Sequence, residues 1–202
     1  MLANLKTLVE WKEACLRYRF DITRFMIEAL DMTPTWQQDL LLSSIALDGS
    51  RTTVSSGHGC FGIDTPIMCA NGKIKPVQNV AIGDKLMGDD GQSVRHVLEL
   101  KRGKENMYRF TYSDGTSHIF NESHILCLMR DGKFFTLTVR DYLFSNDCEK
   151  YKSMVAYRLI GNKYINLPIK SVEPLGEGDY YGFILDGNNK FLGGDFTVLH
   201  NT

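Results

Sequence analysis

Apolar residues in the first part of the chain recur at the spacing of helices. The stretch NLKTLVEWKEACLRYRFDITRFMIEAL, residues 4–30, places them at intervals of three and four, which predicts one amphipathic helix or two. In the following run, TPTWQQDLLLSSIAL, Thr35 and Gln38 have the spacing of a capping box. The β-branched run RTTVSS at 51–56 predicts a strand. We therefore expect a helical segment that ends in one strand.

From Cys60 onward the period of the pattern changes to two. Asn71-Gly72 separates two alternating runs, which is a strong hairpin signal. Further turn residues, at 89–91, 113–115, 130–132 and 186–189, punctuate short runs such as VRHVLEL, MYRFTY, HILCLM and FFTLTV. Residues 60–201 are numerous enough for an independent, mostly β core. The change at 59/60 comes without the flexible linker that usually joins two domains.

Composition narrows the class of protein without naming a function. The hydrophobic content of 43% and the charged content of 23% are those of an ordinary globular protein. A net charge of −1 gives no electrostatic case for nucleic acid or a membrane surface. No apolar run has the length of a membrane-spanning helix. The five cysteines are an odd number without tight spacing, which favours a reducing compartment, by default the cytoplasm.

The junction between the two patterns interrupts a familiar loop. TTVSSGHG, residues 52–59, reads as a strand that enters a glycine-rich phosphate loop. Such a loop continues to Gly-Lys-Ser or Gly-Lys-Thr, because the lysine reaches the phosphates. Cys60 and FGIDTPI stand there instead. A nucleotide-binding module at residues 51–60 therefore lacks its essential cation.

Reactive residues stand at both ends of the β-patterned part. Cys60 follows Gly59, and its thiol can attack the uncrowded glycine carbonyl and convert the amide into a thioester. At the other end, the Asn201 carboxamide can attack its own carbonyl, with His200 beside it to assist. Thr202 supplies a hydroxyl that can accept the acyl group. Together these residues form one apparatus that can excise 60–201 and join 59 to 202.

Residues 60–202 resemble an intein of the Hedgehog/intein (Hint) fold. CFGIDTPIMCANGKIKPVQNVAIGDKLMG is similar to the family's N-terminal splicing block, and SDGTSHIFNESHILCLM to its second block. YYGFILDGNNKFLGGDFTVLHNT is similar to the two C-terminal blocks. The resemblance implies a horseshoe-like all-β splicing domain. Because the interior is too short for a homing-endonuclease insert, a mini-intein is implied.

The resemblance also implies roles for single residues. His124 would assist departure of the Cys60 nitrogen, and Asn121 holds a position where the family often has Thr, so that its side chain would bind the same peptide unit. Near Asn189 relatives often carry a histidine that this chain lacks. Asp195 is a candidate to orient water or Thr202.

The first 59 residues resemble the start of the ATPase domain of a phage terminase large subunit. WQQDLLLSSIALDGSRTTVSSGHG carries this resemblance. It implies a host protein that acts on DNA with ATP once splicing has completed its phosphate loop. Splicing itself would be intramolecular, in a monomer in the cytoplasm of a phage-infected bacterium, without a cofactor, metal, membrane or partner.

Three alternatives stay open at this point. A Hedgehog-like or bacterial intein-like processing domain would share the chemistry at Cys60 but would cleave without ligation. The nucleotide-binding module is the second alternative. The third is a zinc module built from Cys60, His124, Cys127 and His200, although their spacing lacks the paired CxxC pattern of structural zinc sites.

Overall fold

The computed structural model describes residues 8–19, 21–34, 36–47, 49–51 and 59–201, and it divides the chain into two compact units, 1–56 and 57–202. The first unit contains the helices α1 (Leu8–Tyr18), α2 (Ile22–Leu30) and α3 (Trp36–Ile45). The sequence predicted one helix or two in 4–30, and the structure has two. Asp21 separates them, since its side chain accepts a hydrogen bond at 2.8 Å from the backbone N–H of Arg24 and thereby caps α2.

The helical unit shows large exposed apolar side chains. The residues whose burial is described, 11–19, 21–34, 38–47 and 49–51, are exposed or only half-buried, and Trp11 is 53% and Leu40 65% exposed. The predicted capping residue Thr35 and, from residue 52 onward, the predicted strand at 51–56 lie outside the described residues. A folded unit normally hides most of its large apolar side chains, so the exposure of Trp11 and Leu40 is a notable feature of these helices.

The second unit is mostly β, as the alternating pattern predicted. Its elements, in order, are β1 (Pro66–Met68), β2 (Ile74–Pro76), a 3-10 turn (Val77–Asn79), β3 (Lys85–Met87), β4 (Val94–Tyr112), β5 (Ser117–Asn121), β6 (Ile125–Arg130), β7 (Lys133–Thr138), α4 (Val139–Phe144), α5 (Cys148–Lys152), β8 (Ala156–Ile160), β9 (Lys163–Leu167), β10 (Ile169–Leu185), β11 (Lys190–Leu192) and β12 (Val198–His200). The strands pair antiparallel, and the sheet does not close into a barrel.

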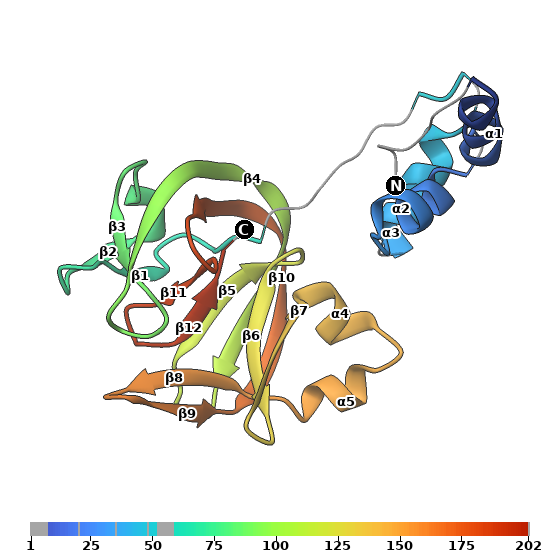
Figure 1. The fold of residues 1–202 in the computed structure, drawn as a ribbon. Helices are drawn as coiled ribbons and strands as arrows, with labels where there is room; N and C mark the ends of the chain where they lie inside the picture. The colour runs from blue at the N-terminus through green and yellow to red at the C-terminus, as the bar shows by residue number, and fades with distance from the viewer. Residues whose placement is uncertain (1–7, 20, 35, 48, 52–58, 202) are drawn as a thin grey trace. The chain divides into compact units, whose positions relative to one another are not determined.

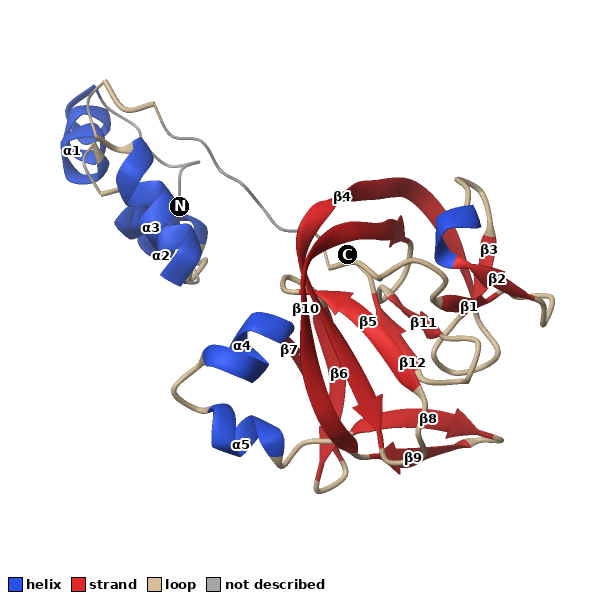
Figure 2. Cartoon of the chain, turned by 180° about the vertical axis from the view of Figure 1, so that it is seen from behind, coloured by secondary structure: helices blue, strands red, loops and turns tan. Residues whose placement is uncertain are grey.

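Two long strands form the frame of this unit. β4 and β10 run antiparallel along almost their whole lengths and curve together, as Figures 1 and 2 show from opposite sides. The register shifts between Pro174 and Gly176, where a glycine at φ +77° takes up the irregularity. The sequence had separated VRHVLEL from MYRFTY, but both runs belong to β4, because the charged residues between them continue the pairing with β10.

The turns stand where the sequence placed them. The hairpin of β1 and β2 pairs Met68 with Ile74 around Gly72, whose φ is +80°. The helices α4 and α5 are an addition that the alternating pattern did not predict. The first begins because Thr138 accepts a hydrogen bond at 3.0 Å from the backbone N–H of Asp141, which ends β7 and caps the helix.

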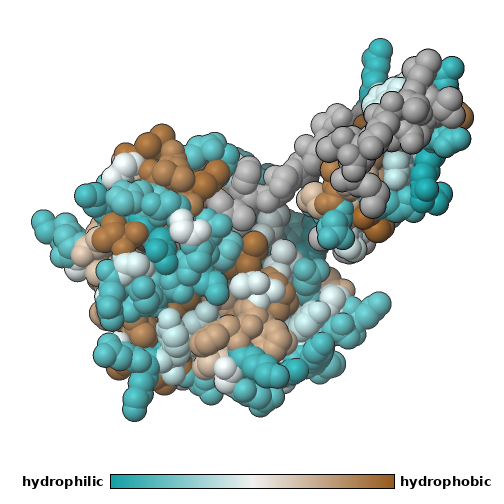
Figure 3. All heavy atoms as spheres, in the orientation of Figure 1, coloured by the Kyte–Doolittle hydropathy of each residue, from teal (hydrophilic) through white to brown (hydrophobic). Residues whose placement is uncertain are grey.

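Aromatic side chains fill the centre of the unit. Five phenylalanines have less than 2% of their surface exposed: Phe61, Phe110, Phe120, Phe183 and Phe191. Burial of each contributes about 1.5–3 kcal/mol, and aromatic pairs such as Phe183 and Phe191, at 5.2 Å between ring centroids, add about 0.5–1.5 kcal/mol. On the face drawn in Figure 3, hydrophobic patches alternate with hydrophilic residues over this unit. Phe61, which directly follows Cys60, therefore lies in the main core.

Candidate functional site

Cys60 is held by the strands on either side of it. The next residue, Phe61, exchanges two backbone hydrogen bonds of 2.8 Å with Tyr181 of β10 and also bridges Phe120 of β5. Cys60 itself is fully buried. Its backbone N–H donates to Oδ1 of Asn121 at 2.8 Å, and its carbonyl accepts from the backbone N–H of Asn121 at 3.2 Å. Asn121 therefore has the contact with this peptide unit that its position in the sequence suggested.

Gly182 of β10 brings the two ends of the β-rich unit together. A Cβ atom placed on this glycine would lie 2.2 Å from Sγ of Cys60 and 3.3 Å from Nδ2 of Asn201. The sulfur and the carboxamide nitrogen therefore cannot be farther apart than the sum of these distances. The two groups that the sequence placed at opposite ends of the unit share one small space, which any side chain at position 182 would fill.

The Cys60 thiol is protonated at rest. Burial, together with the carboxylate of Glu105, raises its pKa to about 12, against the opposing effect of the Arg102 and Lys101 cations. A thiol in this environment is a poor nucleophile until it loses its proton. The proton therefore has to leave as the sulfur attacks.

His124 lies in the aromatic core with its ring fixed on two sides. It stacks on Phe120 with 4.3 Å between ring centroids and meets Phe61 edge-on at 4.7 Å. Burial is the main cause that holds its pKa well below the ordinary value, and His200 and His118 act in the same direction. Its Nδ1 has no hydrogen-bond partner within the described part of the chain. A neutral imidazole with an unpaired nitrogen is suited to accept or pass on a proton.

His200 and Asn201 are positioned by backbone pairing. His200 pairs with Lys190 across β11 and β12, and the backbone N–H of Asn201 donates to the carbonyl of Asn189 at 2.9 Å. Asn189, whose φ is +59°, thus contacts Asn201 through its backbone carbonyl. Burial and then the Lys190 cation lower the pKa of His200 to about 4.

The polar atoms of these two side chains are poorly satisfied. Nδ1 of His200 and both Oδ1 and Nδ2 of Asn201 are buried and make no hydrogen bond to any described residue. Each such group costs about 1–3 kcal/mol, so native structures keep them rare. A carboxamide held here without partners is free to turn toward its own carbonyl.

Asp195 lies in a different set of contacts. Its carboxylate accepts from Nη2 of Arg158 at 2.6 Å and from Oγ1 of Thr197 at 2.9 Å, and Nε2 of His118 lies 3.6 Å away. These contacts tie the turn before β12 to β8 and β5. They make Asp195 a support of the C-terminal hairpin, which is a simpler explanation of this carboxylate than the predicted action on Thr202.

Of the two junction residues Gly59 and Thr202, the structure describes only the first. Gly59 is described and buried, directly before Cys60. Thr202 lies outside the described residues. Its predicted role as acceptor stays a prediction.

Glu105 and Gly182 are neighbours of the site that the sequence did not reveal. Glu105 accepts hydrogen bonds from Nδ2 of Asn121 and, at 2.6 Å, from Oγ of Ser123. It stands in the charged run KRGKEN, which looks like ordinary solvated surface. Gly182 is one of eighteen glycines and lies in the middle of a strand, where a glycine without a turn is the one available hint of a close approach.

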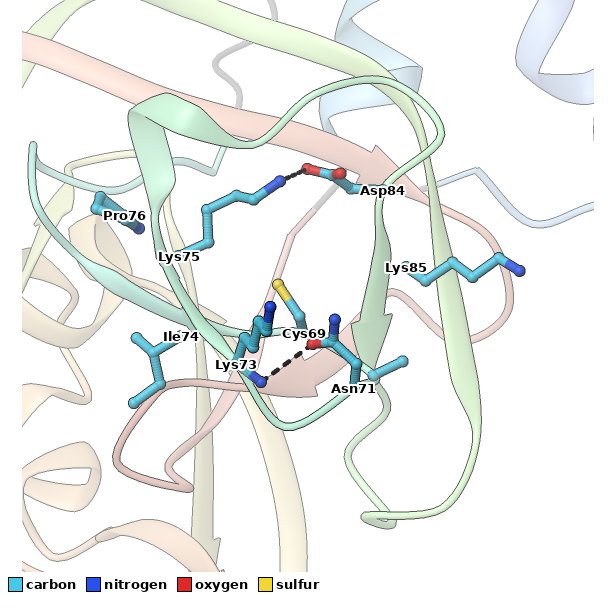
Figure 4. Close-up of a pocket in the computed structure, with 9 residues that line it drawn as sticks. Cys69, Asn71, Lys73, Ile74, Lys75, Pro76, Asp84 and Lys85 are labelled. Atoms are coloured by element: carbon cyan, nitrogen blue, oxygen red, sulfur yellow. Dashed lines mark hydrogen bonds and ion pairs between the residues drawn. The ribbon is translucent and has the colours of Figure 1, made fainter.

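The unit has a further cavity away from Cys60 and Asn201. A cavity of about 530 Å³ lies at the first hairpin (Figure 4), lined among others by Cys69, Asn71 and Lys73. There Lys75 points to Asp84 and pairs with it at 2.6 Å, and Asp84 also caps the turn before β3 by accepting from the backbone N–H of Ala81. Among the described residues no three His, Cys, Asp or Glu side chains are grouped to hold a metal ion. In those same ranges no helix is long and apolar enough to cross a bilayer.

Comparison with known proteins defines the class of the β-rich unit. Residues 60–146 match the family model described as Hom_end-associated Hint. The gp41-1 intein is similar in structure, with a TM-score of 0.56 and 20% identity over 72% of this chain and 100% of that one. A DnaB intein from Synechocystis sp. PCC 6803 has a TM-score of 0.58 and 16% identity over 71% of this chain and 99% of its own.

Curated relatives match over short stretches. A probable terminase large subunit of Enterobacteria phage P7 is 45% identical over 59 residues, 29% of this chain. The catalytic subunit of a V-type proton ATPase from Candida tropicalis is 43% identical over 51 residues, 25% of this chain. The matched stretches span only 12% and 5% of the lengths of these two relatives.

Residues 60–146 thus carry the match to a Hint model, and the β-rich unit as a whole has the fold of inteins. The described strands and two short helices of the unit match the whole length of the gp41-1 intein, which supports the predicted mini-intein. The Hint fold of inteins supports protein splicing or autoprocessing, and the terminase match is consistent with insertion in a terminase.

Proposed function

We propose that residues 60–201 excise themselves by protein splicing and join Gly59 to Thr202. The observation that carries this proposal is the convergence of the Cys60 sulfur and the Asn201 carboxamide on Gly182. An enzyme that only cut at Cys60 would have no need of a self-cleaving asparagine in the same space. Cleavage without ligation at Thr202 is the alternative outcome, and detection of a peptide that joins Gly59 to Thr202 separates the two.

The first step converts an amide into a thioester. Sγ of Cys60 attacks the carbonyl carbon of Gly59, the bond from that carbon to the Cys60 nitrogen breaks, and the thiol proton ends on the nitrogen. His124, neutral and fixed by Phe61 and Phe120, carries the proton between the two atoms. A positioned acid or base contributes about 10²–10⁴ in rate.

The later steps move the acyl group and release the domain. Oγ of Thr202 attacks the thioester, which returns the Cys60 thiol and leaves a branched ester. A secondary alcohol is a poor nucleophile, so this step depends on proximity, which can supply about 7–11 kcal/mol. Nδ2 of Asn201 then attacks its own carbonyl carbon, breaks the bond to Thr202 and closes a succinimide, assisted by His200. The freed Thr202 amine finally takes the acyl group from the ester.

We propose further that residues 1–59 begin the ATPase domain of a terminase-like host. The terminase match supports this origin, and so do the helices with large exposed apolar side chains, because a piece of a larger domain has to leave part of its core uncovered. Splicing would restore the sequence GHGT in the phosphate loop of a host that uses ATP on DNA. The reaction is intramolecular, without cofactor or partner, in a cytoplasm that keeps Cys60 reduced.

Intact-mass measurement of the purified 202-residue chain, with and without dithiothreitol, tests this proposal. We expect dithiothreitol to release residues 1–59 as a thioester adduct, and Cys60→Ala to abolish that release. In Asn201→Ala the thiol-dependent release should continue while cleavage before Thr202 stops. The proposal would be rejected if Cys60→Ala released residues 1–59 as the parent chain does, or if the parent chain released no fragment at any thiol concentration.

A further inference from the structure

Glu105 is bonded to the site through both of its carboxylate oxygens. It lies in β4, half-buried, opposite Gly178 of β10. Oε1 accepts from Oγ of Ser123 at 2.6 Å, and Oε2 accepts from Nδ2 of Asn121. Oδ1 of Asn121 in turn accepts from the backbone N–H of Cys60 at 2.8 Å. An unbroken chain of hydrogen bonds thus connects a carboxylate to the nitrogen at the upstream junction.

The carboxylate decides which way the Asn121 carboxamide faces. An asparagine side chain has an acceptor oxygen and a donor NH₂ group at nearly the same positions, so a half-turn exchanges them. An ionised carboxylate only accepts hydrogen bonds. Glu105 therefore attracts the NH₂ end, and the oxygen is left facing the N–H of Cys60. In the reversed orientation two donors would meet at Cys60, and the carboxamide oxygen would meet the Glu105 carboxylate.

Ser123 keeps the carboxylate in place. Its hydroxyl occupies the second oxygen of Glu105, so the carboxylate cannot turn both oxygens toward Asn121 or solvent. Asn121 itself is completely buried, and a water molecule has little access to substitute for the lost partner. This arrangement leaves the Asn121 side chain a single well-bonded orientation.

We propose that Glu105 is a positioning residue for the acyl shift at Cys60, acting through Asn121. The inference rests on the proposed splicing function. As the bond between the Gly59 carbonyl carbon and the Cys60 nitrogen breaks, the nitrogen takes up the thiol proton and gains positive charge. The Asn121 oxygen, polarised by the carboxylate on the other side of the amide, stabilises the N–H groups of that nitrogen.

The negative charge of Glu105 has a second effect with the opposite sign. Of the charged groups that face Cys60 from β4, Glu105 disfavours the thiolate, and Arg102 and Lys101 favour it. From β10, the phenol of Tyr180 lies near both Cys60 and Glu105. Removal of the carboxylate charge would therefore ease ionisation of the thiol while it frees the Asn121 carboxamide to reverse. The direction of the change in rate tells which effect governs the reaction.

Thiol-induced release of residues 1–59 from the 202-residue chain, followed at several pH values between 6 and 9, measures this direction. We expect Glu105→Gln to slow the release by roughly tenfold to a hundredfold, the range for loss of a hydrogen bond to a charged group. Glu173→Gln is the matched control, because Glu173 is an exposed carboxylate on β10 paired with Arg109 at 2.8 Å. It should release the fragment at the parent rate.

A double variant separates positioning from a general structural effect. Because Glu105 acts through Asn121, Glu105→Gln should add little to the loss already caused by Asn121→Ala, and the two effects should not multiply. Cleavage before Thr202 should keep its parent rate in all these variants. Multiplying effects, or an equal loss at both junctions, would overturn the inference.

Two further results have distinct meanings. A Glu105→Gln chain that releases its fragment as fast as the parent, or faster, rejects the positioning role and leaves only the effect of charge on the thiol. Failure of the parent chain to show release that depends on Cys60 rejects the splicing proposal itself. Thermal melting of Glu105→Gln within a few degrees of the parent excludes loss of folding as the cause of a slow rate.

Discussion

The two halves of the proposed splicing site are built in different ways. At the upstream junction, side chains hold Cys60: Asn121 bonds its N–H at 2.8 Å, and Glu105 and Ser123 hold Asn121. At the downstream junction, backbone pairing in β11 and β12 positions Asn201, and its carboxamide has no hydrogen-bond partner among the described residues. One half is held tightly around an unreactive thiol, and the other leaves its nucleophile unbonded.

This difference indicates how one domain can order two reactions. The upstream half must stabilise a change of charge at nitrogen, for which fixed hydrogen bonds are the effective means. The downstream half needs a carboxamide that can turn toward its own carbonyl, which a hydrogen-bonded amide resists. Gly182 leaves one small space to the Cys60 sulfur and the Asn201 carboxamide nitrogen, so the two groups lie close together although each is proposed to attack a different carbonyl.

The largest effects should come from removal of either nucleophile. Cys60→Ala should abolish thiol-dependent release of residues 1–59 and leave cleavage before Thr202, while Asn201→Ala should give the reverse. Each nucleophile belongs to one half of the site, so its loss should not spread to the other. Intact-mass time courses of both variants check this, and loss of both cleavages in either folded variant would contradict the division into halves.

Gly182→Ala should slow the reaction at the upstream junction more than the reaction at the downstream junction. The added methyl group would lie 2.2 Å from Sγ of Cys60, where atoms cannot coexist, but 3.3 Å from Nδ2 of Asn201. A displacement of the sulfur by about 1 Å costs about a hundredfold in rate. We expect that loss in thiol-induced release and a smaller one in cleavage before Thr202.

Gly178→Ala is the matched control for this substitution. It adds the same methyl group to the same strand, and the new atom meets a flexible side-chain atom, Cγ of Met107, at 3.1 Å. If Gly178→Ala slows release as much as Gly182→Ala does, the effect belongs to β10 as a whole and not to the space around the sulfur.

The two halves should also respond differently to pH. Since the pKa of Cys60 is raised to about 12, its thiolate fraction increases about tenfold for each pH unit between 6 and 9. The pKa of His200 is lowered to about 4, so its charge does not change in that range. At saturating thiol, upstream release in Asn201→Ala should rise steeply with pH, and downstream cleavage in Cys60→Ala should stay nearly flat. A plateau in the rate of upstream release near pH 7 would show that the pKa of the Cys60 thiol is not raised.

The smallest expected effects are on stability. Asn121→Leu removes the hydrogen-bond partner of one Glu105 carboxylate oxygen and of the Cys60 N–H and should lower the free energy of unfolding by about 1–3 kcal/mol. Asn201→Leu replaces two unsatisfied buried atoms by apolar ones of similar shape and should raise it by about 1 kcal/mol. Chemical denaturation of freshly purified, uncleaved chains measures both. A loss of stability in Asn201→Leu would mean that the Asn201 carboxamide makes hydrogen bonds in the parent chain. The contrast between the two halves would then fail.

The sequence indicated the candidate reactive residues of the site better than the residues that surround them. Cys60, Asn121, His124 and Asn201 could be named because each is a chemically distinctive residue in a recognisable block. The mostly β fold and its turns followed from alternation and from Asn-Gly and Asp-Gly pairs. Burial and pairing then supplied the rest in the structure.

The missed parts depend on long-range pairing. Glu105 meets Asn121 only because β4 and β5 pair, and local composition gives the same charged run a surface position. Gly182 matters because Cys60 and Asn201 both approach it from distant parts of the chain. The continuity of β4 and the helices α4 and α5 were missed for a related reason, since partner strands and caps decide them more than periodicity does.

Ligation across the junctions tests the central claim most directly. In a chain extended beyond Thr202 by a short tag that begins with lysine, splicing joins Gly59 to Thr202, and trypsin should then release TTVSSGHGTK. We predict that mass spectrometry finds this peptide in the parent chain and not in Cys60→Ala. Separate fragments that end at Gly59 and begin at Thr202, with no joined peptide, would contradict splicing and leave a domain that only cleaves.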